Sequence, residues 1–182
     1  MANGTPPDDP RVFVARARAG DQRAFRQLYD LHVSSLFRFL GQFGGTREDV
    51  REWVQQAFIK AFLHLDRFDE RSTFATWLFR IGLNEMRSDR RKLTILTRDD
   101  GRIEEMPAED LADRFVWDQA MRTWLEELDE QKRTVFLLHE VEGFSHGEIA
   151  RILDIEESHS RTILARTRSY LRRRWEGKRK AL

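Results

Sequence analysis

The sequence predicts an all-α protein made of two small helical domains that are joined by a flexible acidic linker, with a helix-turn-helix in the C-terminal domain. Two observations support this fold class. Apolar residues recur at i, i+3, i+4 and i+7 through most of the chain, which places them on one face of an α-helix. No segment shows the alternating apolar and polar pattern of a half-buried strand, so no sheet is expected.

Shifts in periodicity and charge divide the chain into parts. After a disordered N-terminus at residues 1–10, we expect the first helical domain at residues 11–95. Residues 96–114 are acidic, contain Gly and Pro and lack helical periodicity until near their end, so they are interpreted as a flexible linker. Periodicity returns in a second domain at residues 115–176, and a basic tail follows at residues 177–182.

The clearest element of the first domain is a helix with an unbroken apolar stripe, formed by Val50, Trp53, Val54, Ala57, Phe58, Ala61, Phe62 and Leu65. Thr46 is the predicted N-cap of this helix, with Asp49 in its first turn. A second amphipathic helix precedes it and ends at Gly44, and a third begins at Phe74.

Composition limits the class of protein. The chain has 182 residues, of which 40% are hydrophobic and 35% charged, a balance that favours packed helices with charged outer faces. It contains no cysteine, which excludes disulfides and cysteine-based zinc sites and is typical of a reducing compartment. The sequence shows neither a signal peptide nor about 18 consecutive apolar residues, so we expect a cytoplasmic protein without membrane insertion.

A helix-turn-helix is predicted near the C-terminus. Gly143 ends one helix, Ser145 caps the next, and Glu148 occupies the capping-box position. After a polar break a new helix begins near Ser158 and carries several arginines. In a helix-turn-helix such a second helix enters the major groove of DNA. The alternative is an ordinary helical hairpin with a basic surface, but the caps, the spacing and the arginines together favour DNA binding.

Three segments, in order, resemble those of the extracytoplasmic-function (ECF) sigma factors of the bacterial sigma-70 family. Residues 52–62 look like the helix that docks on the clamp of RNA polymerase, and residues 68–84 like the segment that opens and recognises the −10 element. Residues 128–136, with the helix-turn-helix, are similar to the domain that recognises the −35 element. The resemblance covers most of the chain. It implies a non-enzymatic protein that needs no cofactor and directs core RNA polymerase to promoter DNA.

The resemblance also assigns residues to promoter DNA. At the −10 element they are Phe68, Trp77, Arg80, Asn84, Arg87, Arg90 and Arg91. Aromatic rings can stack on separated bases, an Asn can both donate and accept hydrogen bonds, and arginines neutralise phosphates. We expect Phe74, Leu78 and Ile81 to be core residues, with Trp77 shared between core and DNA. At the −35 element the assigned residues are His159, Arg161, Thr162, Arg166 and Arg168.

The docking helix departs from the family pattern. The residues expected to face the polymerase are Asp49, Arg51, Glu52, Gln55 and Gln56. Arg51 and Gln56 stand where acids are usual, which should weaken docking on a basic partner surface. One hypothesis is that a Ser/Thr kinase phosphorylates Thr46 and so supplies the missing negative charge. The alternatives are that Thr46 only caps the helix and that an anti-sigma factor controls the protein.

Two other classes of protein compete with this interpretation. A stand-alone helix-turn-helix regulator would explain the C-terminal domain but not the aromatic segment from Phe68 to Trp77. Such a regulator should bind duplex DNA well in isolation, whereas a sigma factor should bind it poorly. An enzyme is disfavoured because the five histidines lack metal-ligand spacing and the chain has no Gly-rich phosphate loop or nucleophile motif. The resemblance leaves the promoter sequence open, because Asp154 and the pair Thr162-Ile163 depart from the usual helix-turn-helix residues.

Overall fold

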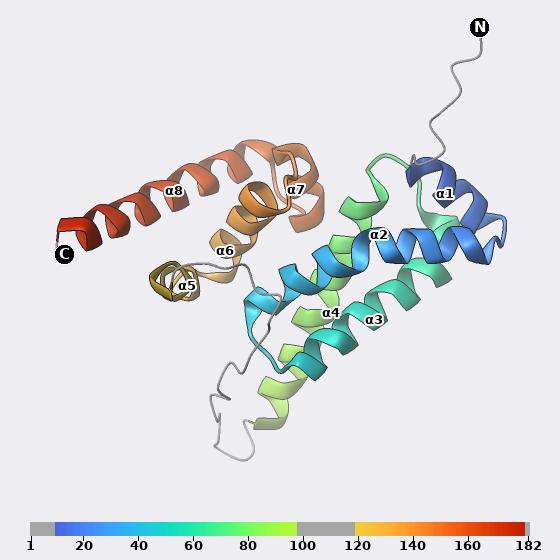
Figure 1. The fold of residues 1–182 in the computed structure, drawn as a ribbon, viewed down its shortest axis with the longest axis horizontal. Coiled ribbons are helices and arrows are strands. Elements are labelled where there is room, and N and C mark those ends of the chain that lie inside the picture. The colour runs from blue at the N-terminus through green and yellow to red at the C-terminus, as the bar shows by residue number, and fades with distance from the viewer. Residues whose placement is uncertain (1–9, 98–118, 181–182) are drawn as a thin grey trace, which may run out of the picture. The chain divides into compact units, whose positions relative to one another are not determined.

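The computed structural model describes residues 10–97 and 119–180, and throughout these two ranges it contains helices and no strand (Figure 1). The chain divides into two compact units, called unit 1 (residues 1–110) and unit 2 (residues 111–182). The prediction of an all-α protein with two domains is therefore confirmed. The predicted disordered N-terminus lies outside the described residues except for its last residue, and so does most of the predicted linker.

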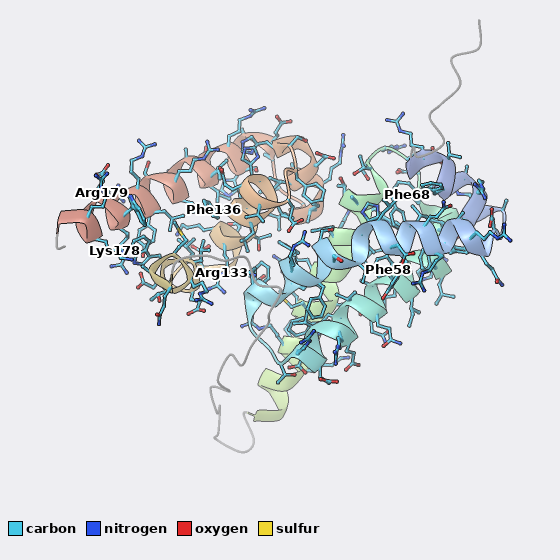
Figure 2. The ribbon with its side chains drawn as sticks, in the orientation of Figure 1. Phe58, Phe68, Arg133, Phe136, Lys178 and Arg179 are labelled. Atoms are coloured by element: carbon cyan, nitrogen blue, oxygen red, sulfur yellow. The ribbon has the colours of Figure 1, made fainter. Side chains whose placement is uncertain are left out.

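The described part of unit 1, residues 10–97, forms four helices and two short 3-10 turns. They are α1 (Pro10–Arg18), α2 (Gln22–Leu40), η1 (Gly41–Phe43), α3 (Arg47–Leu63), η2 (Leu65–Arg67) and α4 (Phe74–Thr97). The helices α2 and α3 run antiparallel, because the rings of Phe25 and Phe62 lie 4.8 Å apart and those of Tyr29 and Phe58 4.7 Å apart (Phe58 is labelled in Figure 2). The helix α4 continues to Thr97, two residues into the predicted linker, so the predicted boundary was too early.

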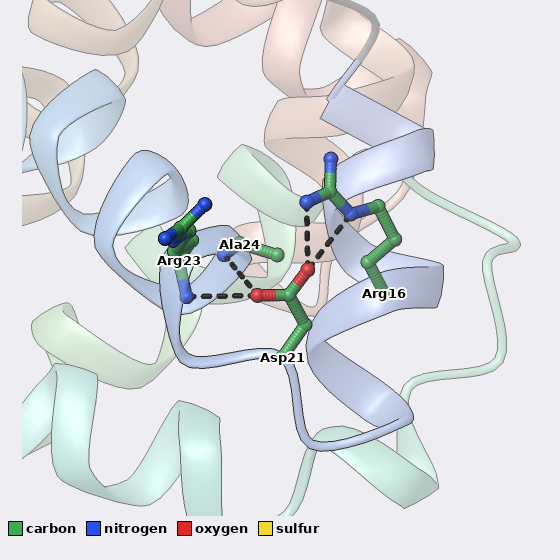
Figure 3. Close-up of polar contacts among 4 residues, drawn as sticks. All are labelled: Arg16, Asp21, Arg23 and Ala24. Carbon is green, nitrogen blue, oxygen red and sulfur yellow. Dashed lines mark hydrogen bonds and ion pairs between the residues drawn. The ribbon is translucent and has the colours of Figure 1, made fainter.

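The turns of unit 1 depend on helix caps. Asp21 caps α2 by accepting hydrogen bonds from the backbone N–H groups of Arg23 and Ala24, and its other carboxylate oxygen accepts two from Arg16 of α1 (Figure 3). The bonds from Arg16, aided by those from the backbone, lower the pKa of Asp21. Thr46 and Asp49 form a reciprocal capping box at the start of α3, with bonds of 2.7 and 3.2 Å. The predicted N-cap is therefore confirmed.

The core of unit 1 is aromatic and tightly packed. Phe39 of α2 meets Phe79 of α4 at 5.2 Å, and both rings are almost completely buried. Gly82 allows α4 to approach α2, since a Cβ atom at this position would lie 2.9 Å from a Leu36 methyl group. Phe74 and Leu78 are buried, as predicted. Ile81 is only half-buried, so its prediction as a core residue was partly wrong. It follows the exposed Arg80 and lies where the buried face of α4 meets its exposed face.

Unit 2 consists of α5 (Gln119–Glu126), α6 (Glu130–Phe136), the π-helical turn η3 (Leu137–Val141), α7 (His146–Leu153) and α8 (Glu157–Lys180). Its core includes Val135, Leu138, Ile149 and Leu164, which are at most 2% exposed. Arg133, labelled in Figure 2, donates hydrogen bonds to the carbonyl oxygens of Leu125, Glu126 and Leu128. One guanidinium thus donates to three carbonyl groups where α5 ends, and the Leu125 carbonyl also accepts the backbone N–H of Leu128 at 3.2 Å.

The helices α7 and α8 form the predicted helix-turn-helix. Ser145 and Glu148 make the capping box at the start of α7. Asp154 ends this helix in the left-handed conformation, with φ 56°, which Gly adopts freely and Asp tolerates better than most other residues. The helix α8 begins at Glu157, one residue before the predicted start, and continues to Lys180. Most of the predicted basic tail is therefore helical, because one Gly costs a helix only about 1 kcal/mol.

Candidate nucleic-acid interface

One stripe of α4 carries several residues that the sequence assigned to the −10 element. At 100° per residue, Trp77, Arg80, Asn84, Arg87 and Arg91 fall on one face of the helix. Arg80, Asn84 and Arg91 are exposed, whereas Trp77 and Arg87 are half-buried. The same spacing places Arg90 to one side of this stripe, about 100° from its centre, so the stripe contains all but one of the assigned residues of α4.

Aromatic side chains form a cluster at the N-terminal end of this stripe. The ring of Phe68, which is 5% exposed, stacks on that of Trp77 at 5.2 Å with an angle of 30° between the planes (Phe68 is labelled in Figure 2). Phe74 meets both rings edge-on, and the ring of His32 lies 5.5 Å from that of Phe74. Burial lowers the pKa of His32. The two aromatic residues that were assigned to DNA therefore contact each other in the free protein.

The segment between η2 and α4 is held by Arg18, a residue that sequence reasoning missed. Its guanidinium donates hydrogen bonds to the carbonyl oxygens of Leu65 and Phe68, at 3.3 and 2.6 Å, and pairs with the carboxylate of Glu70 at 3.0 Å. These partners lie 47 to 52 residues away in the sequence, so no local pattern could have indicated them.

The exposed face of α3 is polar with two apolar side chains. Arg51, Glu52 and Gln55 are exposed, as the docking prediction requires, and Gln56 is half-buried. Two large apolar residues extend this face toward the end of the helix, Ile59 at 41% and Leu63 at 70% exposure. Two of the predicted docking residues already have partners within the helix, since Asp49 belongs to the capping box and Arg51 pairs with Glu48 at 3.2 Å.

The residues assigned to the −35 element all lie on α8 and are exposed, namely His159, Arg161, Thr162, Arg166 and Arg168. Three of these side chains already have hydrogen-bond partners within unit 2. Arg161 pairs with Glu157 one turn earlier on the same helix, and the hydroxyl of Thr162 donates to the carbonyl oxygen of Ser158. Arg168 donates to the carboxylate of Glu140 at 2.7 Å, a bond that ties its guanidinium to η3.

Two histidines stack beneath the helix-turn-helix. The rings of His139 and His146 lie 4.6 Å apart with an angle of 14° between their planes. His146 contacts the hydroxyl of the buried Ser160 at 2.9 Å, and its pKa is lowered by burial and by the neighbouring His139. This contact joins the first turn of α7 to α8, so it helps to set the angle between the two helices.

Within residues 10–97 and 119–180, no three His, Cys, Asp or Glu side chains are grouped so that they could hold a metal ion. Every helix in the same ranges falls short of the length or the apolar character that crossing a membrane requires.

A helix-turn-helix with a cationic second helix, preceded in the same chain by an aromatic and cationic helical unit, defines a DNA-binding transcription factor. The comparisons with known proteins narrow this class. The model of Sigma-70 region 2 matches residues 28–94, and the model of Sigma-70, region 4 matches residues 118–171. The chain belongs to the ECF sigma factors of the bacterial sigma-70 family. Since unit 1 matches region 2, a stand-alone helix-turn-helix regulator is not favoured.

The relatives match nearly the whole chain. The RNA polymerase sigma factor NccH of Alcaligenes xylosoxydans xylosoxydans is 33% identical over 92% of this chain and 95% of its own length. The ECF RNA polymerase sigma-E factor of Escherichia coli is 32% identical over 87% of this chain and 90% of its own. The structure of the sigma factor RpoE from Bartonella quintana, solved with the anti-sigma factor NepR, is 27% identical, with a TM-score of 0.73 over 84% of this chain and 96% of that chain. Sigma factors are transcription initiation factors, and these matches indicate no catalytic family.

Proposed function

We propose that this protein directs core RNA polymerase to specific promoters, with unit 1 opening and recognising the −10 element and unit 2 recognising the −35 element. The observation that carries the proposal is the continuity of the aromatic cluster around Trp77 with the cationic stripe of α4. Extruding one base from the duplex costs a few kcal/mol of free energy, because the base loses its stacking and pairing. Stacking on an aromatic side chain returns about 1–3 kcal/mol per base, so such a cluster beside phosphate-binding arginines favours the open strand.

The −10 surface consists of the aromatic pair Phe68 and Trp77, the amide of Asn84, and the arginines Arg80 and Arg91. These three parts have different roles in this proposal. Trp77 is the half-buried ring of the cluster and offers a stacking surface, while Phe68 supports it from inside. Asn84 lies two turns further along the same face and can present a donor and an acceptor to a captured base. Arg80 and Arg91 flank it on the same face and neutralise the phosphates of the strand, which supplies affinity without sequence preference.

The second DNA contact is made by the exposed face of α8. His159, Thr162 and Arg166 lie within its first three turns, where a helix-turn-helix recognition helix meets base edges and nearby phosphates. Because the side chain of Arg168 is paired with Glu140, we assign it mainly to the structure of unit 2, with a weaker contact to the phosphate backbone than that of Arg166 and none to a base.

The polymerase contact is assigned to the exposed face of α3. It combines the charged and amide side chains of Glu52 and Gln55 with the exposed apolar side chains of Ile59 and Leu63, a mixture that is suited to a protein partner. This assignment places the protein in the cytoplasm, where its partner polymerase acts.

Run-off transcription with purified core polymerase tests the proposal. The full chain should produce promoter-directed transcripts that core polymerase alone does not, and Trp77→Ala should reduce open-complex formation by about tenfold or more, as expected for a lost stacking contact. Trp175→Ala is the matched control, because Trp175 is an exposed tryptophan, 44% accessible, on α8 outside the −10 surface. Absence of any promoter-directed transcript would contradict the proposal, and so would equal activity of the two variants.

Control of docking has two candidate mechanisms. An anti-sigma factor is supported by the relative RpoE, which was solved in complex with one. Phosphorylation of Thr46 is supported by the place of this residue at the start of α3, where a helix N-terminus stabilises an added negative charge. The hydroxyl of Thr46 already accepts the backbone N–H of Asp49, so a phosphate there would have to replace this cap.

A further inference from the structure

Arg18 connects the end of α1 to the segment that leads into the −10 surface. Its Nε and Nη2 atoms donate to the carbonyl oxygens of Leu65 and Phe68, at 3.3 and 2.6 Å. Leu65 is the first residue of the three-residue turn η2, and Phe68 is the C-cap of this turn. Both bonds are part-buried, and the Arg18 side chain is 35% exposed.

The two carbonyl groups differ in their dependence on Arg18. The Leu65 carbonyl also accepts the backbone N–H of Phe68, at 3.3 Å, whereas the Phe68 carbonyl lies just beyond the turn and accepts the shorter bond from Arg18. A 3-10 turn of three residues leaves its last carbonyl groups without partners inside the turn. Leaving a buried acceptor unpaired costs about 1–3 kcal/mol, which gives the guanidinium a strong hold on the backbone at Phe68. A bond to the Phe68 carbonyl also restricts where its ring can lie, because the carbonyl and the side chain share one Cα atom.

The conformation of Glu70 shows a second point of attachment. Its φ is 59°, the left-handed region that a residue with a side chain rarely adopts. Its carboxylate pairs with Nη1 of Arg18 at 3.0 Å. Backbone strain of this kind persists only where surrounding contacts hold it, and it is concentrated at functional segments.

We propose that Arg18 is a positioning residue for −10 recognition. By holding the backbone carbonyls of Leu65 and Phe68 and the carboxylate of Glu70, it sets the stack of Phe68 on Trp77 and thus the shape of the surface that receives the open strand. The inference rests on the proposed function of the −10 surface. It adds α1, a helix outside the matched region 2, to the elements that determine promoter selectivity.

The test measures sequence discrimination, a quantity that partial unfolding does not change. Holoenzyme is assembled from the full chain and core RNA polymerase, and a duplex promoter library randomised at the −10 positions is selected for open complexes. The readout is the ratio of binding between the preferred −10 sequence and the average of the others. A fraction of unfolded protein lowers the binding of every sequence by the same factor, so a purely structural role would leave this ratio at its wild-type value.

Arg18→Ala should reduce this ratio by about tenfold, because the charge-assisted hydrogen bond to the Phe68 carbonyl, which orients the segment, is lost together with the bonds to Leu65 and Glu70. Its matched control is Arg16→Ala, which removes an arginine and its ion pair from the same helix without touching the segment. Arg18→Lys should recover only part of the ratio, because one ammonium group cannot span two carbonyls and a carboxylate. Glu70→Ala removes the ion pair alone and should have a smaller effect than Arg18→Ala.

The possible outcomes separate the inference from the proposed function. An Arg18→Ala ratio equal to that of wild type overturns the inference, whatever the yield of complex. If Arg18→Ala does not fold, wild-type ratios for both Arg18→Lys and Glu70→Ala overturn it. If the wild-type holoenzyme itself shows no −10 preference, the proposed function fails, and this result does not depend on any variant of Arg18.

Discussion

The indole Nε1 of Trp53 donates a hydrogen bond of 2.9 Å to the carboxylate of Asp89, and this bond joins α3 to α4. Trp53 is 3% exposed, and its ring packs so closely on Gly45 that a Cβ there would lie 2.7 Å away. A second contact between the two helices, from Lys60 to Glu85 at 2.7 Å, lies on the surface. The helix assigned to polymerase is thus fastened to the helix assigned to the −10 element.

Removal of the Trp53 donor should destabilise unit 1. Trp53→Phe is expected to lower the free energy of unfolding by about 1–3 kcal/mol, because the part-buried carboxylate of Asp89 loses its partner. Urea denaturation measures the change. The double variant Trp53→Phe with Asp89→Ala should lose less than the sum of the two single variants, and simple additivity would show that the bond contributes nothing.

The packing at Gly82 predicts opposite effects for two Gly→Ala substitutions. Gly82→Ala should destabilise unit 1 by about 1–3 kcal/mol, because the added Cβ would meet a methyl group of the fully buried Leu36 at 2.9 Å. Gly177→Ala on α8 has nothing within 4 Å and should stabilise its helix by up to about 1 kcal/mol. Thermal unfolding of both variants checks the pair, and a Gly82→Ala protein as stable as wild type would show that the helices can separate without cost.

The half-buried His32 makes the stability of unit 1 depend on pH. Burial lowers its pKa in the folded state below the ordinary value, which is about 6.5. Between these two pKa values the unfolded chain binds more protons, so stability falls as pH falls, by at most about 1.4 kcal/mol per pH unit. Hydrogen exchange of core amides in α4 should show this loss between pH 7.5 and 5.5 in wild type and less of it in His32→Gln. An identical pH dependence in both proteins would exclude His32 as its source.

Two arginines of α8 should differ in their contribution to DNA binding. Arg166→Ala should weaken binding of unit 2 to −35 DNA and reduce the slope of log K against log salt by about 0.9, the loss of one phosphate contact. Arg168→Ala should change this slope less, because the guanidinium is paired with Glu140. Holoenzyme binding to a −35 duplex at several salt concentrations measures both slopes. A larger change for Arg168 than for Arg166 would reverse the assignment.

The phosphorylation hypothesis predicts a difference between Thr46→Asp and Thr46→Asn. Both residues are good N-caps, so they preserve the start of α3 while only the Asp adds charge. If docking needs a negative charge here, Thr46→Asp should bind core polymerase about fivefold more tightly than Thr46→Asn, as expected for about 1 kcal/mol of added electrostatic attraction. Equal affinity of the two variants would leave Thr46 as a cap only.

Much of the fold follows from local pattern. The capping residues Thr46 and Ser145 were identified correctly, because an N-cap depends only on neighbours within one turn. The sequence did not predict that α4 continues to Thr97 or that α8 continues to Lys180. Adding a residue to an existing helix is easier than starting a new helix, so both helices extend into segments whose own sequence favours a helix only weakly. Ile81 shows a second limit: the spacing indicates a helix face but not where the neighbouring helix stops covering it.

The sequence by itself determined the helical class, the division into two units, the caps and the stripes of residues that can meet DNA, because each of these is a matter of spacing within one or two turns. Only the tertiary structure decided three contacts. Phe68 is buried and stacks on Trp77, Arg168 donates a hydrogen bond to Glu140, and Arg18 donates one to the Phe68 carbonyl in the segment before α4. These contacts join residues 9 to 50 positions apart, and their formation depends on how the helices pack. The two helical units were therefore predictable from pattern, whereas the side chains that position the −10 surface were not.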